Sequence, residues 1–387
     1  MTIRQSHIDL FSDETLADTQ TVYRELREAG AIVYLPANDL YAITHFAAVK
    51  AALRADDALI SSKGVAANDA INTAGSDATI TSDGATHTRR RLILMRPLMP
   101  KSLHAVRERV EQSAQQLVQD LVSQDRFCGG KDFASHLPLS IVAELVGLEP
   151  KGRENMLDWA SATFDALGPI NDRTYHALPR ALGLLQYVKE LGPDRLRKGG
   201  WAEAIIKCCD AGEISEGEAA MMIIDYTAPS LDTTILASAH MLWRLGVTPG
   251  AYDALKEDPS LIPGVVNESV RLASPIRGFT RYAQAAYESE HGTIPAGARV
   301  AVLYASANWD DMHYNDADAF DVYRNPRDHV GWGHGPHICA GMHLARLEME
   351  ALLRALLNHV ESINVEHPTP ITNNVLQGFA ALPTTFH

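Results

Sequence analysis

The chain has 387 residues with 34 Lys and Arg against 48 Asp and Glu, a formal net charge of −14 at pH 7, and 46% of its residues are hydrophobic. This composition is typical of a globular protein with a large core and excludes disorder as the main state. The acidic balance disfavours any general attraction to nucleic acid or to anionic lipid, and we expect neither as a partner.

Helical periodicity dominates the first two thirds of the chain. The stretch ETLADTQTVYRELREAG predicts a helix that ends at Gly30, and two short β-prone runs follow, AIVYL and LYAIT, on either side of a turn-like PAND. From His87 to Val122 the pattern predicts helix with interruptions near Pro97 and Pro100, because proline removes a backbone donor. Further helices are predicted at 138–147, 150–167, 176–192, 201–211 and, as the longest, from about Ser215 to Leu245. The longest would span over ~40 Å, enough to cross a whole domain.

Beyond Arg271 prolines and glycines separate short strand-like pieces such as RVAVLY. A helix is predicted again from about Gly341 to His359, and the tail NVLQGFAALPTTF predicts a terminal hairpin around Gly378. No repeat, low-complexity tract or linker divides the chain. We therefore expect one domain, residues 1–387, whose fold class is mainly α with small β elements.

The cysteines and the start of the chain bear on the compartment. The four cysteines, Cys128, Cys208, Cys209 and Cys339, are too few and too scattered for a disulfide framework, which indicates a reducing environment. The start, MTIRQSHIDLFSDET, is polar and lacks the layout of a secretory signal. No apolar run reaches the ~18 residues that a membrane-spanning helix needs. A cytoplasmic protein is predicted.

The segment VGWGHGPHICAGMHLARLEME is the most informative part of the sequence. Its glycines and proline predict a tight irregular loop, and Cys339 follows them just before the helix that begins near Gly341. The N-terminus of a helix and its backbone N–H groups favour a thiolate at such a position. A thiolate beside glycines that permit close approach suits a soft metal ligand on a flat cofactor. Zinc is disfavoured, because it needs about four ligands at a recognised spacing.

The string WGHGPHICAG resembles the cysteine loop of the cytochrome P-450 heme-thiolate monooxygenases, Phe-Gly-x-Gly-x-His-x-Cys-x-Gly. Trp332 stands where the family has Phe, and the matching positions are Gly333, Gly335, His337, Cys339 and Gly341. The resemblance implies heme b (iron protoporphyrin IX) as the cofactor, with Cys339 as its proximal iron ligand and with Gly333, His337 and Gly341 in its binding loop. It also implies the family fold, a helix-rich triangular prism in which heme lies between a long central helix and the cysteine-loop helix.

Further motifs follow in the family's order. In ATHTRRR the resemblance assigns His87 and Arg91 to the heme propionates, and their spacing of four residues places them on one helical face. Arg281 falls where the family has another propionate-binding arginine. The LDTT of the long helix resembles the family's acid–alcohol pair, which implies that Asp232 relays protons and that Thr233 orders oxygen and its water.

A Glu-x-x-Arg in NESVR, Glu268 and Arg271, would by itself indicate only a routine helical ion pair. The order of the motifs identifies it with the family's structural cluster, which the family completes with an arginine after a Phe-Asp pair, here Arg324. The implied role of this cluster is to brace the fold behind the heme.

The long helix departs from the family pattern before the acid. The family usually has Ala-Gly three and two residues before it, leaving a groove for O2, whereas this chain has Pro229 and Ser230. Proline leaves the carbonyl of Asp225 without its helical partner, so a kink is expected. The free carbonyl and the Ser230 hydroxyl could hold water in place of the groove, or oxygen handling could differ, for example by use of peroxide.

Four stretches resemble pocket-lining segments of bacterial members that oxidise para-substituted benzoic acids, often by O-demethylation. They are SSKGV (61–65), ATFDALGPIND (162–172), SPIRGFTR (274–281) and VLQGF (375–379). Phe164 and Phe279 could stack on an aromatic ring, Ser230 could contact the substrate, and Lys63 could pair with a carboxylate, although a surface lysine is the commoner case.

The segment from His87 to Arg109 contains seven Lys and Arg against Glu108 alone, a local charge of +6. It is either a solvated helix face or a docking surface for an acidic electron donor. The resemblance implies an iron–sulfur ferredoxin, reduced by a flavin ferredoxin reductase. The predicted function is hydroxylation or O-demethylation of a small aromatic substrate with O2. The alternatives are a peroxide-driven oxidant and a heme-binding sensor without turnover.

Overall fold

The computed structural model describes residues 2–149, 153–191 and 195–387. Its α-helices are α1 (Asp13–Ala17), α2 (Thr19–Ala29), α3 (Phe46–Ala52), α4 (Asp69–Ala74), α5 (Gly84–Met95), α6 (Pro100–Val122), α7 (Ala143–Val146), α8 (Met156–Ala166), α9 (Asp172–Lys189), α10 (Trp201–Asp210), α11 (Glu216–Val247), α12 (Ala251–Glu257), α13 (Ile262–Ala273), α14 (Tyr304–Asn308) and α15 (Met342–His359). Short 3-10 and π-helical turns are η1 (Arg96–Leu98), η2 (Gly129–Ala134), η3 (Pro138–Val142), η4 (Arg153–Asn155), η6 (Pro259–Leu261) and η7 (Gly335–His337).

The strands are short and form four small sheets. They are β1 (Arg4–Gln5), β2 (Ile32–Leu35), β3 (Leu40–Ile43), β4 (Leu59–Ile60), β5 (Phe127–Cys128), β6 (Phe279–Ala283), β7 (Tyr287–Ser289), β8 (Gly292–Ile294), β9 (Arg299–Val302), β10 (Ile363–Val365), β11 (Thr369–Pro370), β12 (Phe379–Ala381) and β13 (Pro383–Phe386). The largest sheet has the order β1-β2-β3-β9-β6-β4. These elements confirm the mainly α fold class with small β elements.

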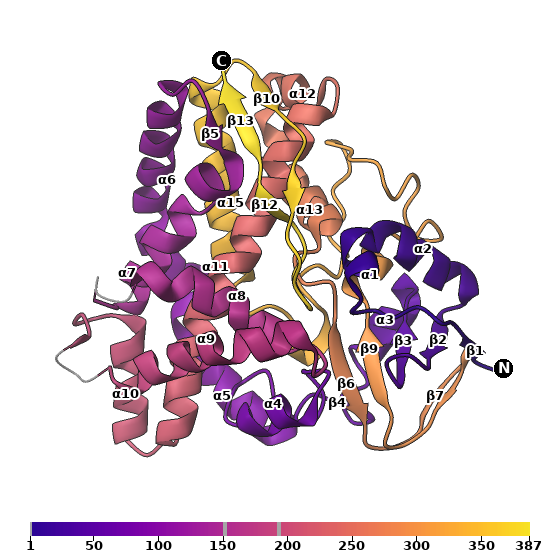
Figure 1. Ribbon diagram of the computed structural model, residues 1–387. Helices are drawn as coiled ribbons and strands as arrows, with labels where there is room; N and C mark the ends of the chain where they lie inside the picture. Colours follow the sequence, from indigo (N-terminus) through magenta and orange to yellow (C-terminus); the bar gives the residue numbers. More distant parts are fainter. Residues whose placement is uncertain (1, 150–152, 192–194) are drawn as a thin grey trace.

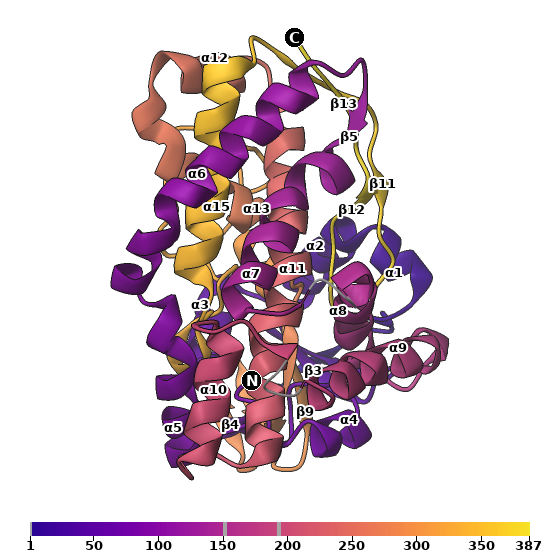
Figure 2. The ribbon, with the colours of Figure 1, turned by 90° about the vertical axis from the view of Figure 1, so that its left-hand side faces the viewer.

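Helices fill one side of the molecule, and the six-stranded sheet with α1, α2 and α3 forms the other side (Figure 1). On the helical side α6 packs along α15, and α11 runs through the interior against α8, α13 and η2 (Figure 2). None of the helices in the described parts of the chain combines the length and the apolarity that crossing a membrane requires.

The predicted interruption of the helix after His87 is confirmed. α5 ends at Met95, η1 carries the first proline, and α6 begins at Pro100. Proline is well tolerated at the first position of a helix, because the N–H that it lacks would have no intrahelical partner there. The break turns the chain, so that α5 and α6 present different faces to the rest of the fold.

The sheet positions two of the predicted site residues. β6 pairs antiparallel with β9, which places Phe279 opposite Val302 and Arg281 opposite Val300. Side chains two residues apart in a strand project from the same face. Phe279 and Arg281 therefore point to the same side of β6, and both are buried.

A hairpin forms near the end of the chain, but Gly378 is not at its turn. β11 pairs antiparallel with β12, and the Ile371 N–H donates to the carbonyl of Gly378 at 3.0 Å, so the chain reverses between residues 371 and 378. In this reversal Leu376 bridges to Ile276, and the backbone N–H of Arg277 donates to the carbonyl of Val375 at 3.0 Å. β13 pairs with β10 and β5 and not with β12, so the predicted position of the hairpin is corrected.

α11 begins with a capping box in which the Ser215 hydroxyl accepts from the Glu218 N–H at 3.1 Å and the Glu218 carboxylate accepts from the Ser215 N–H at 2.9 Å. The helix then continues through Pro229 to Val247. Near Pro229 the Thr233 hydroxyl donates to the Pro229 carbonyl at 2.6 Å. The long central helix predicted from the sequence is therefore confirmed, and proline does not end it.

Candidate functional site

The cysteine loop is fixed by its own backbone. The Cys339 N–H donates to the carbonyl of Trp332 at 2.7 Å, and the Gly333 N–H donates to the carbonyl of Val330 at 2.8 Å. Gly335 has a φ of +71°, and a Cβ built on it would lie 2.3 Å from the carbonyl oxygen of Leu53. Only glycine fits this position, because a side chain would require both a strained backbone and a displaced neighbouring segment.

Burial raises the pKa of the Cys339 thiol, while the backbone N–H groups of Gly341 and Met342 and the guanidinium of Arg91 lower it. The thiolate expected from the helix N-terminus is thus only partly supported by the protein itself. A metal cation bound at the sulfur would supply the missing positive charge and deprotonate the thiol. This donor set fits a thiolate-ligated metal.

The three predicted propionate-binding residues, His87, Arg91 and Arg281, lie together with His337 of the cysteine loop. The rings of His87 and His337 have centroids 4.0 Å apart, Arg91 donates to the carbonyl of Ile338, and Arg281 extends from β6. Burial and the charges of Arg281, His87 and Arg91 lower the pKa of His337 to about 2. Such mutual repulsion indicates a cluster that lacks an anion.

The buried Nε2 of His87 has no hydrogen-bond partner among the described residues. Its pKa is lowered by burial and by Arg91, and the nearby carboxylate of Asp83 only partly offsets this. An unpaired buried nitrogen costs free energy unless a ligand satisfies it. Together with the cysteine loop, the cluster therefore fits a flat group that carries both a metal and carboxylates, as heme does.

Both the cysteine loop and the middle of α11 contain residues that are not fully buried. From Gly331 to His343 each residue is half-buried except Pro336, which is exposed. On α11, Pro229 is exposed and Thr233 half-buried although both lie in the middle of an interior helix. At 100° per residue five side chains share this side of the helix within an arc of about 100°, and we call it the distal face. They are Asp225, Pro229, Asp232, Thr233 and Leu236.

Asp232 is 8% exposed, and its Oδ2 has no partner among the described residues. Burial, with a smaller contribution from Asp158, raises its pKa to about 7. A carboxyl with this pKa exchanges protons readily near neutral pH, as a relay requires. The hydroxyl of Thr233 lies on the same face, already donating to the Pro229 carbonyl.

The predicted structural cluster is assembled and buried. Arg271 makes a bidentate pair with Glu268, at 2.7 and 2.8 Å, and Arg324 donates to the same carboxylate at 2.9 Å. Arg271 also donates to the carbonyls of Asn308 and Ala317 at 2.6 and 2.7 Å. Because these carbonyls belong to the segment that leads to the cysteine loop, the cluster ties that segment to α13.

The four predicted substrate segments meet in one apolar cluster, which we call the aromatic cluster. It contains Phe164, Phe279, Val65 and Leu376 and also Leu236 of the distal face. The segments are directly hydrogen-bonded, since the Thr280 N–H donates to the Val65 carbonyl at 3.3 Å and the Asn374 N–H to Asp165 Oδ1 at 2.7 Å.

Two predicted substrate-binding residues, Lys63 and Ser230, are not members of the aromatic cluster. Lys63 is exposed, with its Nζ 5.7 Å from the centroid of the Tyr282 ring, so it stands on the surface rather than in the aromatic cluster. Ser230 is half-buried beside Pro229 on α11. An exposed lysine keeps its ammonium group in water, here near the Tyr282 ring. A match of sequence segments does not show which of their side chains point outward.

The basic segment carries far less free charge than the sequence suggested. Arg89 and Arg90 both pair with Glu218, and the arginines further along pair with acidic residues as well. These pairs are Arg96 with Glu213, Arg107 with Glu111 and Arg109 with Glu144. The local charge of +6 is therefore largely neutralised, by Glu111 on the same helix and by Glu144, Glu213 and Glu218 farther along the chain. The exposed residues of this segment include apolar Leu92 and Met99 and basic Lys101, for which no ion pair is found among the described residues.

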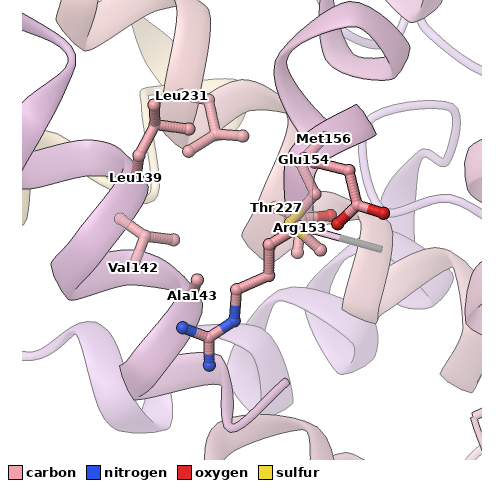
Figure 3. A pocket seen from close by; sticks show the side chains of 8 residues that line it. All are labelled: Leu139, Val142, Ala143, Arg153, Glu154, Met156, Thr227 and Leu231. Carbon is pink, nitrogen blue, oxygen red and sulfur yellow. The ribbon is translucent and has the colours of Figure 1, made fainter. Parts of the chain in front are cut away.

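A separate cavity of about 220 Å³ lies on the other side of α11, where Thr227 and Leu231 line it (Figure 3). These two residues point roughly opposite to Pro229, by the angular spacing of a helix. The remaining walls come from Leu139, Val142, Ala143, Arg153, Glu154 and Met156. None of the five residues of the distal face lines this cavity.

Comparisons with known proteins identify the family and the fold. The family described as Cytochrome P450 matches residues 204–386. The chain is 33% identical over 386 residues to cytochrome p450 CYP199A2 of Rhodopseudomonas palustris, covering 97% of this chain and 93% of that protein. It is 28% identical to the beta-dihydromenaquinone-9 omega-hydroxylase of Mycobacterium tuberculosis, covering 97% and 77%. The fold matches P450BioI, crystallised with a fatty-acid-ligated acyl carrier protein, with a TM-score of 0.88 at 22% identity, covering 97% of this chain and 100% of that one.

Proposed function

The chain belongs to the cytochrome P450 family and is a heme b monooxygenase, and from this premise we propose that it hydroxylates or O-demethylates a small aromatic compound. The observation that carries the substrate proposal is the aromatic cluster, to which Phe164, Phe279 and Leu236 of the distal face all belong. Aromatic side chains favour stacked or edge-to-face contact with an aromatic ring. The proposed substrate has the size and shape of a para-substituted benzoic acid.

The heme, when bound, supplies the oxidation chemistry, in which thiolate ligation of iron favours cleavage of the O–O bond. We assign Cys339 as the ligand, and we assign binding of the propionates to His87, Arg91, Arg281 and His337. Their charges support this assignment, because a buried cluster of basic groups favours an anion. The heme would also satisfy the unpaired Nε2 of His87.

Asp232 and Thr233 handle protons in this proposal. The Oδ2 of Asp232 takes a proton from solvent and passes it along the distal face, since its pKa of about 7 allows both steps at neutral pH. The Thr233 hydroxyl donates a hydrogen bond to the Pro229 carbonyl at 2.6 Å, and this bond orients the hydroxyl. The apolar side chains of the aromatic cluster exclude water from the substrate.

Electrons come from an iron–sulfur ferredoxin and its flavin reductase, and we propose that the ferredoxin docks at Leu92, Met99 and Lys101. This surface adjoins Arg91, whose guanidinium donates to the carbonyl of Ile338, next to Cys339. The side chains of Leu92 and Met99 are 67% and 48% exposed, and apolar contacts with a charged rim suit a transient electron-transfer complex.

The test is a titration of the heme-loaded protein with para-methoxy aromatic compounds, followed by turnover with a ferredoxin and its reductase. Displacement of water by substrate is expected to shift the Soret band to shorter wavelength, and turnover to release formaldehyde and the phenol. No spectral shift with any of these compounds at millimolar concentration would contradict an aromatic substrate. Turnover with hydrogen peroxide alone would instead indicate a peroxide-driven oxidant, and binding without turnover a sensor.

A further inference from the structure

Asp225 introduces a carboxylate into the distal face one helical turn before Pro229. It is half-buried, whereas α11 as a whole lies in the interior. Leu236, which belongs to the aromatic cluster, projects within about 20° of Asp225 around the helix axis. The carboxylate therefore lies on the side of α11 that the substrate would face.

The loop between α4 and α5 brings the carboxylate and the aromatic cluster together. The Thr79 N–H donates to Asp225 Oδ2 at 3.2 Å, and the next residue, Ile80, packs against the aromatic cluster. Figures 1 and 2 show α4 and α5 at the same end of the molecule as the start of α11. Asp225 is thus located where this loop, α11 and the apolar substrate region meet.

A purely structural role would be to hold this loop, but Arg90 already does so. Its guanidinium donates to the carbonyls of Ser76 and Ala78 at 2.8 and 2.9 Å and to Glu218 at 2.7 Å. Arg90 is also the basic residue that acts on Asp225 electrostatically, yet its donors are committed to those partners. The loop is therefore anchored without the charge of Asp225.

The hydrogen-bonding partner of the Asp225 carboxylate is Thr79. The Thr79 N–H donates to Oδ2 at 3.2 Å, and the Thr79 side chain also acts on the carboxylate, whereas within the described parts of the chain no ion pair involves Asp225. Burial raises its pKa to about 6, so the group is mostly ionised at neutral pH and still lacks a cation. A carboxylate in this state gains most from a donor with positive charge.

Resting on the proposed function, we propose that Asp225 determines specificity by binding a hydrogen-bond-donating group, above all an ammonium, at the polar end of the aromatic substrate. A substrate with a carboxylate at that end would place two like charges together, which disfavours its binding. The exposure of Lys63 also supports a preference for an ammonium over a carboxylate, because the side chain predicted to pair with a substrate carboxylate lies on the surface.

The test uses three compounds with the same ring and the same para-methoxy group, namely 4-methoxybenzylamine, 4-methoxytoluene and 4-methoxybenzoate. Spectral titration of the heme-loaded protein gives a dissociation constant for each. We expect the amine to bind roughly ten- to a hundredfold more tightly than the benzoate, the range of a charge-assisted hydrogen bond, with the toluene between them.

Asp225→Asn removes the charge and keeps an oxygen for the Thr79 N–H, so the loop retains its contact. In this variant we expect the dissociation constant of the amine to rise and that of the benzoate to fall, while that of the toluene changes by no more than about twofold. Asp77→Asn is the matched control, because Asp77 lies in the same loop, with its side chain 50% exposed, 3.6 Å from Arg90. It removes the same charge and should leave the order of the three ligands unchanged.

Equal or tighter binding of the benzoate by the unmodified protein would overturn the role of Asp225, as would an unchanged ligand order in Asp225→Asn. A Soret shift to longer wavelength with the amine would also overturn it, because that shift places the nitrogen on iron. Each of these results would leave the proposal of an aromatic substrate intact. If none of the three compounds shifts the spectrum, the proposed function and this inference both fail.

Discussion

Replacing Asp232 with Asn should make the protein more stable, and increasingly so as the pH rises. Burial raises the pKa of Asp232 from an ordinary 3.8 to about 7, so the folded protein holds this proton more tightly than the unfolded chain. The contribution of the protonated carboxyl to the stability of the folded protein is fully present below about pH 4 and is lost as the pH rises toward about 7. At 1.36 kcal/mol for each pKa unit, the ionised group costs about 4 kcal/mol above that window. Asn cannot ionise and avoids this cost.

Denaturation of the heme-loaded protein at several pH values measures the difference. We expect Asp232→Asn to exceed the unmodified protein by about 4 kcal/mol near pH 8 and by about 1 kcal/mol near pH 4.5. Product formation should fall at least about tenfold in the same variant, because the relay is lost. Asp158→Asn is the comparison, since Asp158 has an exposed side chain paired with Arg180 at 2.8 Å and makes only the smaller contribution to the pKa of Asp232, so it should change the pH dependence much less. A stability difference for Asp232→Asn that does not vary with pH would refute the reasoning.

Three further predictions concern the cofactor, the fold and the electron donor. Gly335→Ala should lose heme during gel filtration whereas Gly333→Ala should retain it. Both have positive φ, but a Cβ on Gly335 would lie 2.3 Å from the backbone oxygen of Leu53, whereas a Cβ on Gly333 would lie at an ordinary 3.6 Å from that of His337. Glu268→Gln should lower the free energy of unfolding by about 3–5 kcal/mol in a denaturant titration, since it leaves the buried charge of Arg271 uncompensated, and a loss below 1 kcal/mol would contradict this. Lys101→Glu should slow reduction by ferredoxin severalfold at low salt without changing substrate titrations, and an unchanged rate would place the donor elsewhere.

The sequence was most informative where function demands local geometry. The cysteine loop could be predicted because its glycines and Cys339 are close in the chain, and the Glu268–Arg271 pair because one helical turn separates them. Matching segments also located part of the aromatic cluster, since each of the four predicted stretches contributes a member to it.

Contacts between distant segments explain what could not be predicted. The arginines near His87 looked like free charge because Glu218, which pairs with two of them, lies far along the chain. In the sequence, Pro229 draws attention only to the backbone carbonyl of Asp225, which loses its helical N–H partner. The position of Asp225 seven residues before Asp232 nevertheless predicts that both carboxylates lie on one helical face. The loop that makes its carboxylate informative could be located only in three dimensions.

The most direct test of the account is the difference spectrum of the reduced protein with carbon monoxide. Ligation by the Cys339 sulfur predicts a strongly red-shifted Soret band, and Cys339→His should move that band to the position typical of imidazole-ligated heme. A band at the imidazole position in the unmodified protein, or a red-shifted band that survives Cys339→His, would contradict thiolate ligation at this residue.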